Sequence, residues 1–332
     1  MTRRNALFAL QAAMTVGLLV LLFRRFDWQA LQHLLAGLPW WFYAGAFVTV
    51  LAGQVIYALR WYVVLSALRV PVSAAATMNM FFVGVFFNNF LPSTMGGDSV
   101  KVYYLGRAEG YARIGASVLI DRVLSLFFVA TVALALTREV WAGSGALSGA
   151  LGAIVAIWGG LVAALIAIAI APPDFWLGRL RQRWPRLGAM IDGGNRVLAD
   201  MQAVLRRPQT LALSGGLAMA YFGLLGFVYQ YFIQAATGTR PALIPVIGVV
   251  AAIATLSNLP VAINGLGLRE QLHLALLGTF GLSAEAAAGI SLLLFANLLA
   301  VSTIGAICWL STPGGRAANR AVNPAPAAGA DV

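Results

Sequence analysis

A polar, helix-breaking segment, NNFLPSTMGGDSVK, occupies residues 88–101 directly after the apolar run MNMFFVGVFF. It brings together two amides, a proline, two hydroxyls, two glycines, a carboxylate and a lysine. In hydrocarbon, backbone N–H and C=O groups must be hydrogen-bonded, so a non-helical chain survives at depth only inside protein or around a wet cavity. We therefore expect this segment either to contact a polar ligand or to cap a purely structural hairpin.

The first break has the composition of a helix end followed by a new helix start. Pro92 removes a hydrogen-bond donor and disfavours helix at Leu91, whereas Gly96 and Gly97 permit positive φ. The predicted new helix starts near Asp98, which would be its N-cap. Its unpaired N–H groups and positive dipole end would suit a phosphate or another anion. The candidate ligand-binding residues here are Asn88, Asn89, Pro92, Ser93, Thr94, Gly96, Gly97, Asp98 and Lys101.

A second break of the same kind, SNLPVAINGLGLREQ, occupies residues 257–271. In both breaks an asparagine precedes the proline, a glycine follows that proline by five positions and a cation follows it by nine. Paired Gly/Pro-broken hydrophobic segments in two halves of a chain are the best sequence pointer to a transporter's binding site. The candidate binding residues of the second break are Asn258, Pro260, Asn264, Gly265, Gly267, Arg269 and Glu270.

Ionisable side chains inside apolar runs are further candidates, because such groups are rare in membranes and usually pair across helices. Asp121 and Arg122 lie about two turns into their run. Arg60 interrupts a long apolar stretch, where facing a polar interior and snorkelling to the surface are equally compatible with the pattern. Adjacent Arg269 and Glu270 diverge by about 100° on a helix, so we expect them to contact different partners, Arg269 a phosphate and Glu270 another cation. The candidates for proton or ion coupling are Asp98, Asp121 and Glu270.

The elements that must position these residues are membrane-spanning helices. Of 332 residues, 61% are hydrophobic and only 10% are charged, which excludes a soluble domain. Apolar runs of about 18 or more residues predict spanning helices. Six occur, at 6–23, 40–59, 115–136, 150–171, 211–233 and 286–310. The fold class is therefore all-α, that of a polytopic integral membrane protein.

The charge distribution predicts the topology. The net charge of +11 reflects the bias of Arg and Lys toward cytoplasmic loops, and no partner nucleic acid is expected. The loop 172–208 holds seven Arg against three Asp and should be cytoplasmic, as either an amphipathic helix on the inner leaflet or a solvated linker helix. Both termini should also be cytoplasmic, in a bacterial inner membrane. No metal-ligand cluster or cofactor motif is present, so we expect no cofactor and no metal.

When membrane crossings are counted from both termini, segments 74–92 and 241–282 each begin and end on the same side of the membrane. Each must therefore enter the membrane and return to the side from which it came. The prediction is six full spans plus two re-entrant helical hairpins that dip in from opposite faces. This arrangement would form an inverted repeat with halves at roughly 1–136 and 150–311. Residues 1–311 would be one transmembrane domain, and 312–332 a disordered tail rich in Pro, Ala and Gly.

The order NNFLPSTMGGDSVKVYYL, SVLIDRVLSLF and NLPVAINGLGLREQL, with LRWYVVL upstream, resembles the lysylphosphatidylglycerol synthase transmembrane-region family of flippase-like membrane proteins. The resemblance runs from about residue 8 to 311. It does not name the lipid, and without a soluble aminoacyltransferase domain we expect no lysyl-lipid synthesis by this chain. The family's conserved polar positions fall on Asn89, Pro92, Gly96, Gly97, Asp98, Asp121, Arg122, Pro260, Gly265, Gly267, Arg269 and Glu270.

The leading hypothesis is translocation of a polar- or anionic-headgroup lipid, or of a lipid-linked precursor. Its headgroup would be held between the two breaks, and Lys101, Arg122 and Arg269 would counter a phosphate. There is no Walker A sequence, so a gradient or downhill movement is expected rather than ATP use. The alternatives are an intramembrane enzyme acting on a lipid phosphate or glycosyl carrier, and a membrane scaffold for a partner lipid-biosynthetic enzyme.

Overall fold

The structure is a computed structural model that describes residues 28–90, 96–137, 148–170, 188–258 and 267–311. All regular structure in these ranges is helical, which confirms the all-α prediction. In chain order the helices are α2 (Trp28–Ala36), α3 (Trp40–Ala67), α4 (Ala74–Phe90), α5 (Gly96–Glu109), α6 (Tyr111–Leu136), α8 (Ser148–Ile170), α10 (Gly188–Leu205), α11 (Pro208–Thr237), α12 (Leu243–Ser257), α13 (Leu268–Leu277), the 3₁₀ turn η4 (Gly278–Phe280) and α14 (Ala284–Ser311).

Five helices in the described ranges are long and apolar enough to cross a membrane: α3, α6, α8, α11 and α14. They coincide with five of the six predicted spans, because uninterrupted apolar runs favour helix in hydrocarbon, where every backbone group must be bonded within the segment. The remaining predicted span, residues 6–23, lies outside the described residues, as does the tail 312–332. The chain is a multi-pass membrane protein.

Two pairs of short helices occur where the sequence predicted the two re-entrant hairpins. The helices α4 and α5 have 17 and 14 residues, and α12 and α13 have 15 and 10. At 1.5 Å per residue, each is shorter than the roughly 30 Å hydrocarbon core. Within each pair the two helices pack against each other. Each pair is therefore a compact unit whose two helices flank one of the polar breaks in the sequence.

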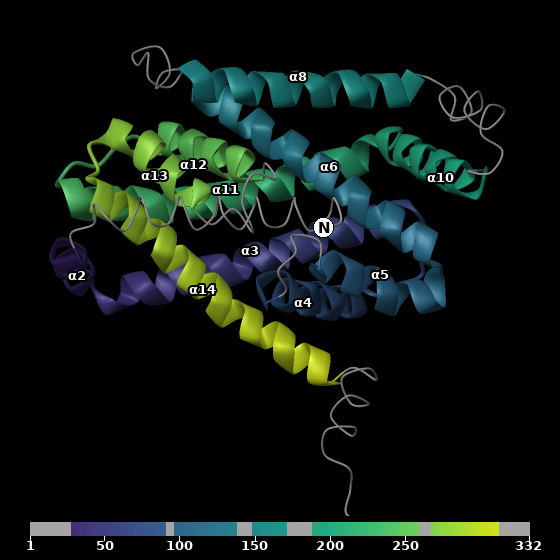
Figure 1. Cartoon of the computed structure of the whole chain (residues 1–332), viewed down its shortest axis with the longest axis horizontal. Coiled ribbons are helices and arrows are strands. Elements are labelled where there is room, and N and C mark those ends of the chain that lie inside the picture. Colours follow the sequence, from purple (N-terminus) through teal and green to yellow (C-terminus); the bar gives the residue numbers. More distant parts are fainter. Residues whose placement is uncertain (1–27, 91–95, 138–147, 171–187, 259–266, 312–332) are drawn as a thin grey trace, which may run out of the picture.

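Helices early in the chain pack on helices late in the chain. The helices α3 and α11 pack along each other, α4 packs on α14, and α12 packs on α6 (Figure 1). Close backbone approaches make these crossings possible. A Cβ on Gly305 of α14 would lie 2.0 Å from the Phe82 carbonyl oxygen, and one on Gly248 of α12 would lie 2.7 Å from the Leu136 carbonyl carbon. Small residues commonly let membrane helices approach in this way.

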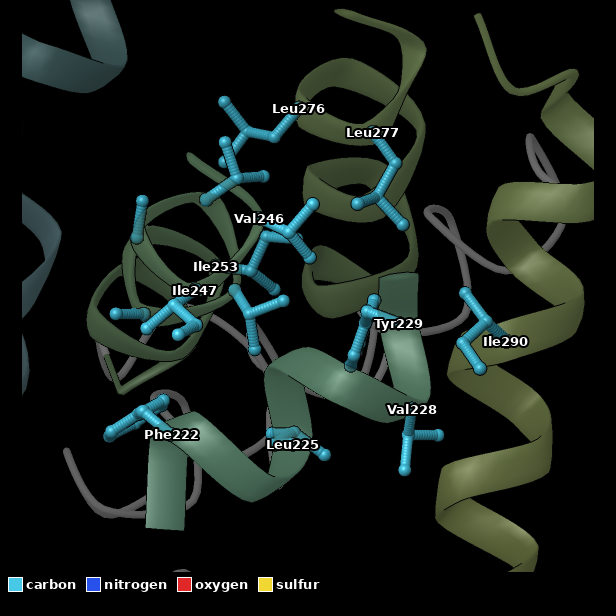
Figure 2. Close-up of a cluster of buried hydrophobic side chains, with 14 of the residues drawn as sticks. Phe222, Leu225, Val228, Tyr229, Val246, Ile247, Ile253, Leu276, Leu277 and Ile290 are labelled. Atoms are coloured by element: carbon cyan, nitrogen blue, oxygen red, sulfur yellow. The ribbon is translucent and has the colours of Figure 1, made fainter. Parts of the chain in front are cut away.

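The largest buried apolar cluster joins the second half of the chain. Figure 2 shows Phe222 and Leu225 of α11, Ile253 of α12, Leu277 of α13 and Ile290 of α14 converging on one core. Because lipid is as apolar as these side chains, the cluster gains its stability from dense packing more than from leaving water. Leu276 and Leu277, at the end of α13, belong to this cluster, so the helix that follows the second polar break is packed against α12 and α14.

The helix α10 covers the part of the loop 172–208 that the structure describes. Its apolar side chains Ile191, Met201 and Val204 are buried, and α10 packs on α6 and α8. The Nε2 of Gln202 donates a hydrogen bond of 2.8 Å to the Ile168 carbonyl near the end of α8. Residues 188–205 of the loop are therefore packed against the protein by one face, and residues 172–187 lie outside the described residues.

Candidate functional site

The first break is held together by one asparagine and two glycines. The Gly97 N–H donates to Oδ1 of Asn88 at 2.8 Å, so the end of α4 is tied to the start of α5. A Cβ on Gly97 would lie 1.9 Å from the Gly84 carbonyl oxygen, so the two helices are in backbone contact there. The neighbouring Asn89 bonds within its own helix, where its Nδ2 donates to the Val85 carbonyl at 3.0 Å.

The carboxylate of Asp98 has a different role from the one predicted. The described part of α5 already begins at Gly96, so Asp98 lies within its first turn and the prediction of an N-cap is wrong. The helix starts earlier because the two glycines that precede Asp98 are themselves helical. The Asp98 carboxylate instead accepts a hydrogen bond from Lys101 at 2.9 Å and pairs with Arg122 of α6.

A second buried ion pair joins α3 to α6. The guanidinium of Arg60 donates to both carboxylate oxygens of Asp121, at 2.9 and 3.1 Å, and to the hydroxyl of Ser125 at 2.8 Å. Only 4% of Arg60 is exposed, so of the two alternatives for this residue the polar interior is the one observed. Adjacent residues diverge by about 100° on a helix, which is why Asp121 faces α3 while Arg122 faces α5.

The ammonium group of Lys101 is surrounded by aromatic rings as well as by Asp98. Its Nζ lies 4.5 Å from the centre of the Phe81 ring and 5.2 Å from that of Trp61. The side chain passes directly over Gly84, where a Cβ would lie 2.4 Å from the Lys101 Cε. A glycine at this position therefore creates the room that allows a lysine to be 93% buried between α4 and α5.

These charged groups line a polar cavity of about 220 Å³. Among the described residues, the lining holds three cations and two carboxylates, an excess of one positive charge. Asn258, the residue that follows α12, lines the same cavity, so the two breaks meet here. We call this space the polar cavity; it is lined by Tyr57, Arg60, Trp61, Phe81, Asn88, Asp98, Lys101, Val118, Asp121, Arg122, Ser125 and Asn258.

The second break is organised by Glu270, which is 1% exposed. Its carboxylate accepts hydrogen bonds from the Gly267 N–H at 2.7 Å, from Arg269 at 2.8 Å and from the hydroxyl of Ser291 at 3.0 Å. The prediction that Arg269 and Glu270 contact different partners is wrong. The Glu270 side chain turns back to the helix start to accept the free N–H, and the long Arg269 side chain reaches around to the same carboxylate.

A second cavity, of about 180 Å³, adjoins the polar cavity. It includes Arg269, Ser291 and the tyrosines Tyr221 and Tyr229, and we call it the tyrosine-lined cavity. Tyr57 lines both cavities and so forms part of the wall between them.

The buried imidazole of His273 has a fully determined hydrogen-bond arrangement beside the tyrosine-lined cavity. Its Nδ1 lies 2.7 Å from the Arg269 carbonyl oxygen, and its Nε2 lies 2.7 Å from the hydroxyl of Tyr229. A carbonyl oxygen can only accept, so Nδ1 carries the proton and Nε2 accepts from Tyr229. Both ring nitrogens are thus satisfied by the protein, which indicates a positioning role for His273.

Equivalent residues of the two breaks have equivalent local roles. Asn89 and Asn258 each donate through Nδ2 to the carbonyl four residues earlier, at 3.0 and 2.8 Å. The matched cations Lys101 and Arg269 each pair with a nearby carboxylate, Asp98 and Glu270 respectively. These two carboxylates are not at matching positions of the two breaks, because Asp98 lies six residues after Pro92 and Glu270 ten residues after Pro260.

The polar cavity brings together seven of the sequence candidates: Arg60, Asn88, Asp98, Lys101, Asp121, Arg122 and Asn258. Arg269 lines the tyrosine-lined cavity instead, and Asn89, Gly96, Gly97, Gly267 and Glu270 are not among the residues that line either cavity. Six further candidates lie outside the residues that the structure describes. These are Pro92, Ser93, Thr94, Pro260, Asn264 and Gly265. Sequence analysis missed Tyr57, Trp61, Ser125 and Ser291, which sit in apolar helices and look like packing residues. Only the spacing of Ser125, four positions after Asp121 on one helix face, gave a usable signal. Where the chain is described, no group of three or more His, Cys, Asp or Glu side chains could hold a metal ion.

Comparison with known proteins identifies the family. The family described as "Lysylphosphatidylglycerol synthase TM region" matches residues 8–306, so the chain belongs to it. A UPF0104 membrane protein of Methanothermobacter thermautotrophicus is 24% identical over 305 residues, covering 85% of this chain and 86% of that protein. A UPF0104 membrane protein of Pyrococcus horikoshii is 33% identical over 75 residues, covering 21% of this chain and 22% of the relative. No solved structure matches.

Proposed function

We propose that this member of the lysylphosphatidylglycerol synthase transmembrane-region family carries a lipid with an anionic headgroup across the membrane. The observation that supports this is the polar cavity, where two helix breaks meet inside a bundle of membrane helices. The family's own description ties it to a system that modifies a membrane lipid. The lipid class proposed here is a phospholipid or a lipid-linked precursor whose headgroup carries a phosphate.

The charge of the polar cavity favours an anion. Three buried or half-buried cations face two carboxylates there, and uncompensated charge inside a membrane is costly unless a ligand or water satisfies it. A phosphate oxygen can accept strong hydrogen bonds from ammonium and guanidinium groups. Asn88 and Asn258 add amide groups from the two breaks. A volume of about 220 Å³ corresponds to about seven water molecules. This space suits a lipid headgroup but is too small for the hydrocarbon chains of the lipid.

The paired architecture supports movement between two states. The order of long, short, short and long helices in α3–α6 recurs in α11–α14, and the contact of α4 with α14 mirrors that of α12 with α6. We infer an inverted repeat with two re-entrant hairpins, in which rocking of one half against the other exposes the central site to each side in turn. From the basic loops we place both termini in the cytoplasm of a bacterial inner membrane.

The three buried carboxylates provide candidate groups for coupling. Asp98, Asp121 and Glu270 are each bound to a cation in this structure. Protonation of any one of them would release its cation, and substrate phosphate binding would have the same effect by competition. We propose that transport is driven by an ion gradient or by the lipid gradient itself, and a proton ionophore added to vesicles with an imposed pH difference tests between these two.

Transport can be measured with purified protein in liposomes that contain acyl-labelled fluorescent phosphatidylglycerol. An impermeant reductant bleaches the label in the outer leaflet, so continued bleaching reports movement between leaflets. The wild-type protein should accelerate bleaching, and the combined Arg122→Gln, Arg269→Gln variant should lose most of this activity. The matched control is Arg196→Gln on α10, because Arg196 is exposed and lines neither cavity.

The same preparation separates transport from the two alternatives. An intramembrane enzyme would change the chemical identity of the lipid, which mass spectrometry of the recovered lipids would detect. A scaffold for a partner enzyme would leave bleaching at the rate of protein-free liposomes in the wild type as well as in the variants. Equal bleaching rates for wild-type protein and the Arg122→Gln, Arg269→Gln variant would remove the proposed transport site.

A further inference from the structure

A groove between α5 and α6 lies directly beside the polar cavity. It has a volume of about 390 Å³, and most of its lining is apolar or aromatic. The side chains that give it this character are Val102, Tyr103, Tyr111, Val118 and Leu119. Its chemistry is thus the opposite of that of the polar cavity, and we call it the α5–α6 groove.

Three residues belong to both spaces. Asp98, Val118 and Arg122 line the α5–α6 groove on one side and the polar cavity on the other. The Asp98–Arg122 ion pair therefore forms part of the wall between them. The side chain of Arg122 is 43% exposed and that of Asp98 is 12% exposed, so the pair runs from the outer side of this wall to the inner side.

The outer edge of the groove is exposed on the surface of the helix bundle. The groove is formed in part by α6, a helix long and apolar enough to span the membrane. Along its rim, Tyr103, Tyr111 and Leu119 are each about half exposed, at 47%, 52% and 49%. Exposed apolar side chains on a spanning helix contact hydrocarbon chains. A lipid chain can therefore occupy the groove and remain continuous with the bilayer.

We propose that the α5–α6 groove is the lateral opening through which the hydrocarbon chain of the substrate leaves the site while its headgroup occupies the polar cavity. The Asp98–Arg122 ion pair is the gate of this opening. The inference rests on the proposed lipid transport, and it specifies the chain-binding site and the access route for that function.

Volume and polarity place the hydrocarbon chain outside the polar cavity. The polar cavity is too small and too charged for an acyl or prenyl chain, so the chain of any lipid held there must leave through an apolar wall. The α5–α6 groove shares three lining residues with the polar cavity, whereas the tyrosine-lined cavity shares only Tyr57 with it. When the gate parts, a substrate phosphate replaces the Asp98 carboxylate as the anion beside Arg122, which compensates for the broken ion pair.

Gly115 offers a way to fill the groove without touching the charged residues. It lines the α5–α6 groove, and a Cβ placed on it meets no atom within 4 Å. Gly115→Phe should reduce transport about tenfold by occupying the path of the chain. Gly152→Phe and Gly160→Phe on the exposed face of α8 are the matched controls, because a Cβ at either position also meets nothing within 4 Å.

The readout uses unlabelled phosphatidylglycerol, because a fluorophore on the chain would itself meet the groove. Impermeant periodate oxidises the glycerol diol of phosphatidylglycerol in the outer leaflet only, so the rate of further oxidation reports transport. If the wild-type protein transports and Gly115→Phe matches it, the groove proposal is overturned while lipid transport stands. If the wild-type protein and both control variants show no transport, the proposed function fails, and the chain route fails with it.

A binding experiment tests the same groove without relying on rates. Phosphatidylglycerol with a diazirine in the middle of its acyl chain is added to wild-type protein in liposomes, irradiated and mapped by mass spectrometry. Crosslinks should concentrate on residues 99–122 relative to α8, and Gly115→Phe should remove them. Crosslinks spread evenly over all lipid-facing helices, or unchanged in Gly115→Phe, would overturn the groove as a chain-binding site.

Discussion

Arg60 of α3 holds Asp121 of α6 through two hydrogen bonds, of 2.9 and 3.1 Å, between side chains that are almost fully buried. This bidentate ion pair joins α3, which packs along α11, to α6, the helix that carries Arg122. Because a buried charge without its partner is far more costly than an apolar pair of similar volume, the two residues should behave as one unit.

The first prediction concerns the stability of this pair. Asp121→Ala leaves Arg60 uncompensated and should lower the free energy of unfolding by about 3–5 kcal/mol. The double variant Arg60→Met, Asp121→Leu should lie within about 1 kcal/mol of wild type, because no charge remains buried. Thermal unfolding in detergent micelles measures both. A double variant less stable than Asp121→Ala would show that the charges are needed for the fold itself.

The second prediction concerns headgroup charge. Lys101→Met keeps the length of the side chain and its packing against Trp61 and Phe81 but removes the excess positive charge of the polar cavity. Transport of phosphatidylglycerol should fall about tenfold, which corresponds to the loss of one charge-assisted contact. Transport of zwitterionic phosphatidylcholine, measured in the same liposome assay, should fall less. An equal loss for both lipids would show that Lys101 acts on the fold rather than on the headgroup.

The third prediction concerns the contact of α4 with α5. In Gly97→Ala the added methyl group would lie 1.9 Å from the Gly84 carbonyl oxygen, and neighbouring backbone cannot move as easily as a side chain. We expect a destabilisation of about 1–3 kcal/mol, as for other overpacked sites. Gly152→Ala on α8 is the control, because a Cβ there meets nothing within 4 Å. The midpoint temperatures of the two variants, compared by thermal unfolding, should differ by several degrees, and equal values would contradict the close contact.

The fourth prediction concerns the start of α13. Gly267 has φ +83° and ψ −51°, a conformation that side chains other than glycine rarely adopt, and its N–H donates to Glu270. Gly267→Ala should therefore cost about 1–3 kcal/mol of stability. Glu270→Gln, which leaves Arg269 without its carboxylate, should cost more than Ser291→Ala, which removes one neutral hydrogen bond worth about 1 kcal/mol. The same unfolding measurement ranks the three variants, and a reversed order would contradict the central role of Glu270.

The sequence by itself determined the elements and the places where they break. Long apolar runs predict spanning helices because hydrocarbon leaves the backbone no partner outside the segment, and this holds for α3, α6, α8, α11 and α14. Proline and glycine act locally, so the helix ends near residues 90 and 258 could also be predicted. So could the need of Asp121 and Arg122 for partners inside the protein, whereas the sequence left Arg60 open between a polar interior and snorkelling.

Only the tertiary structure decided which partners these are. Whether Asp98 caps its own helix or binds Lys101 and Arg122 depends on how closely α4, α5 and α6 approach, and contacts such as Gly97 against Gly84 set that distance. The same holds for Arg269 and Glu270, whose side chains bend away from their ideal helical directions to reach one another and Ser291. The meeting of Asn88 and Asn258 in one cavity depends on the packing of whole helices, which no local pattern specifies.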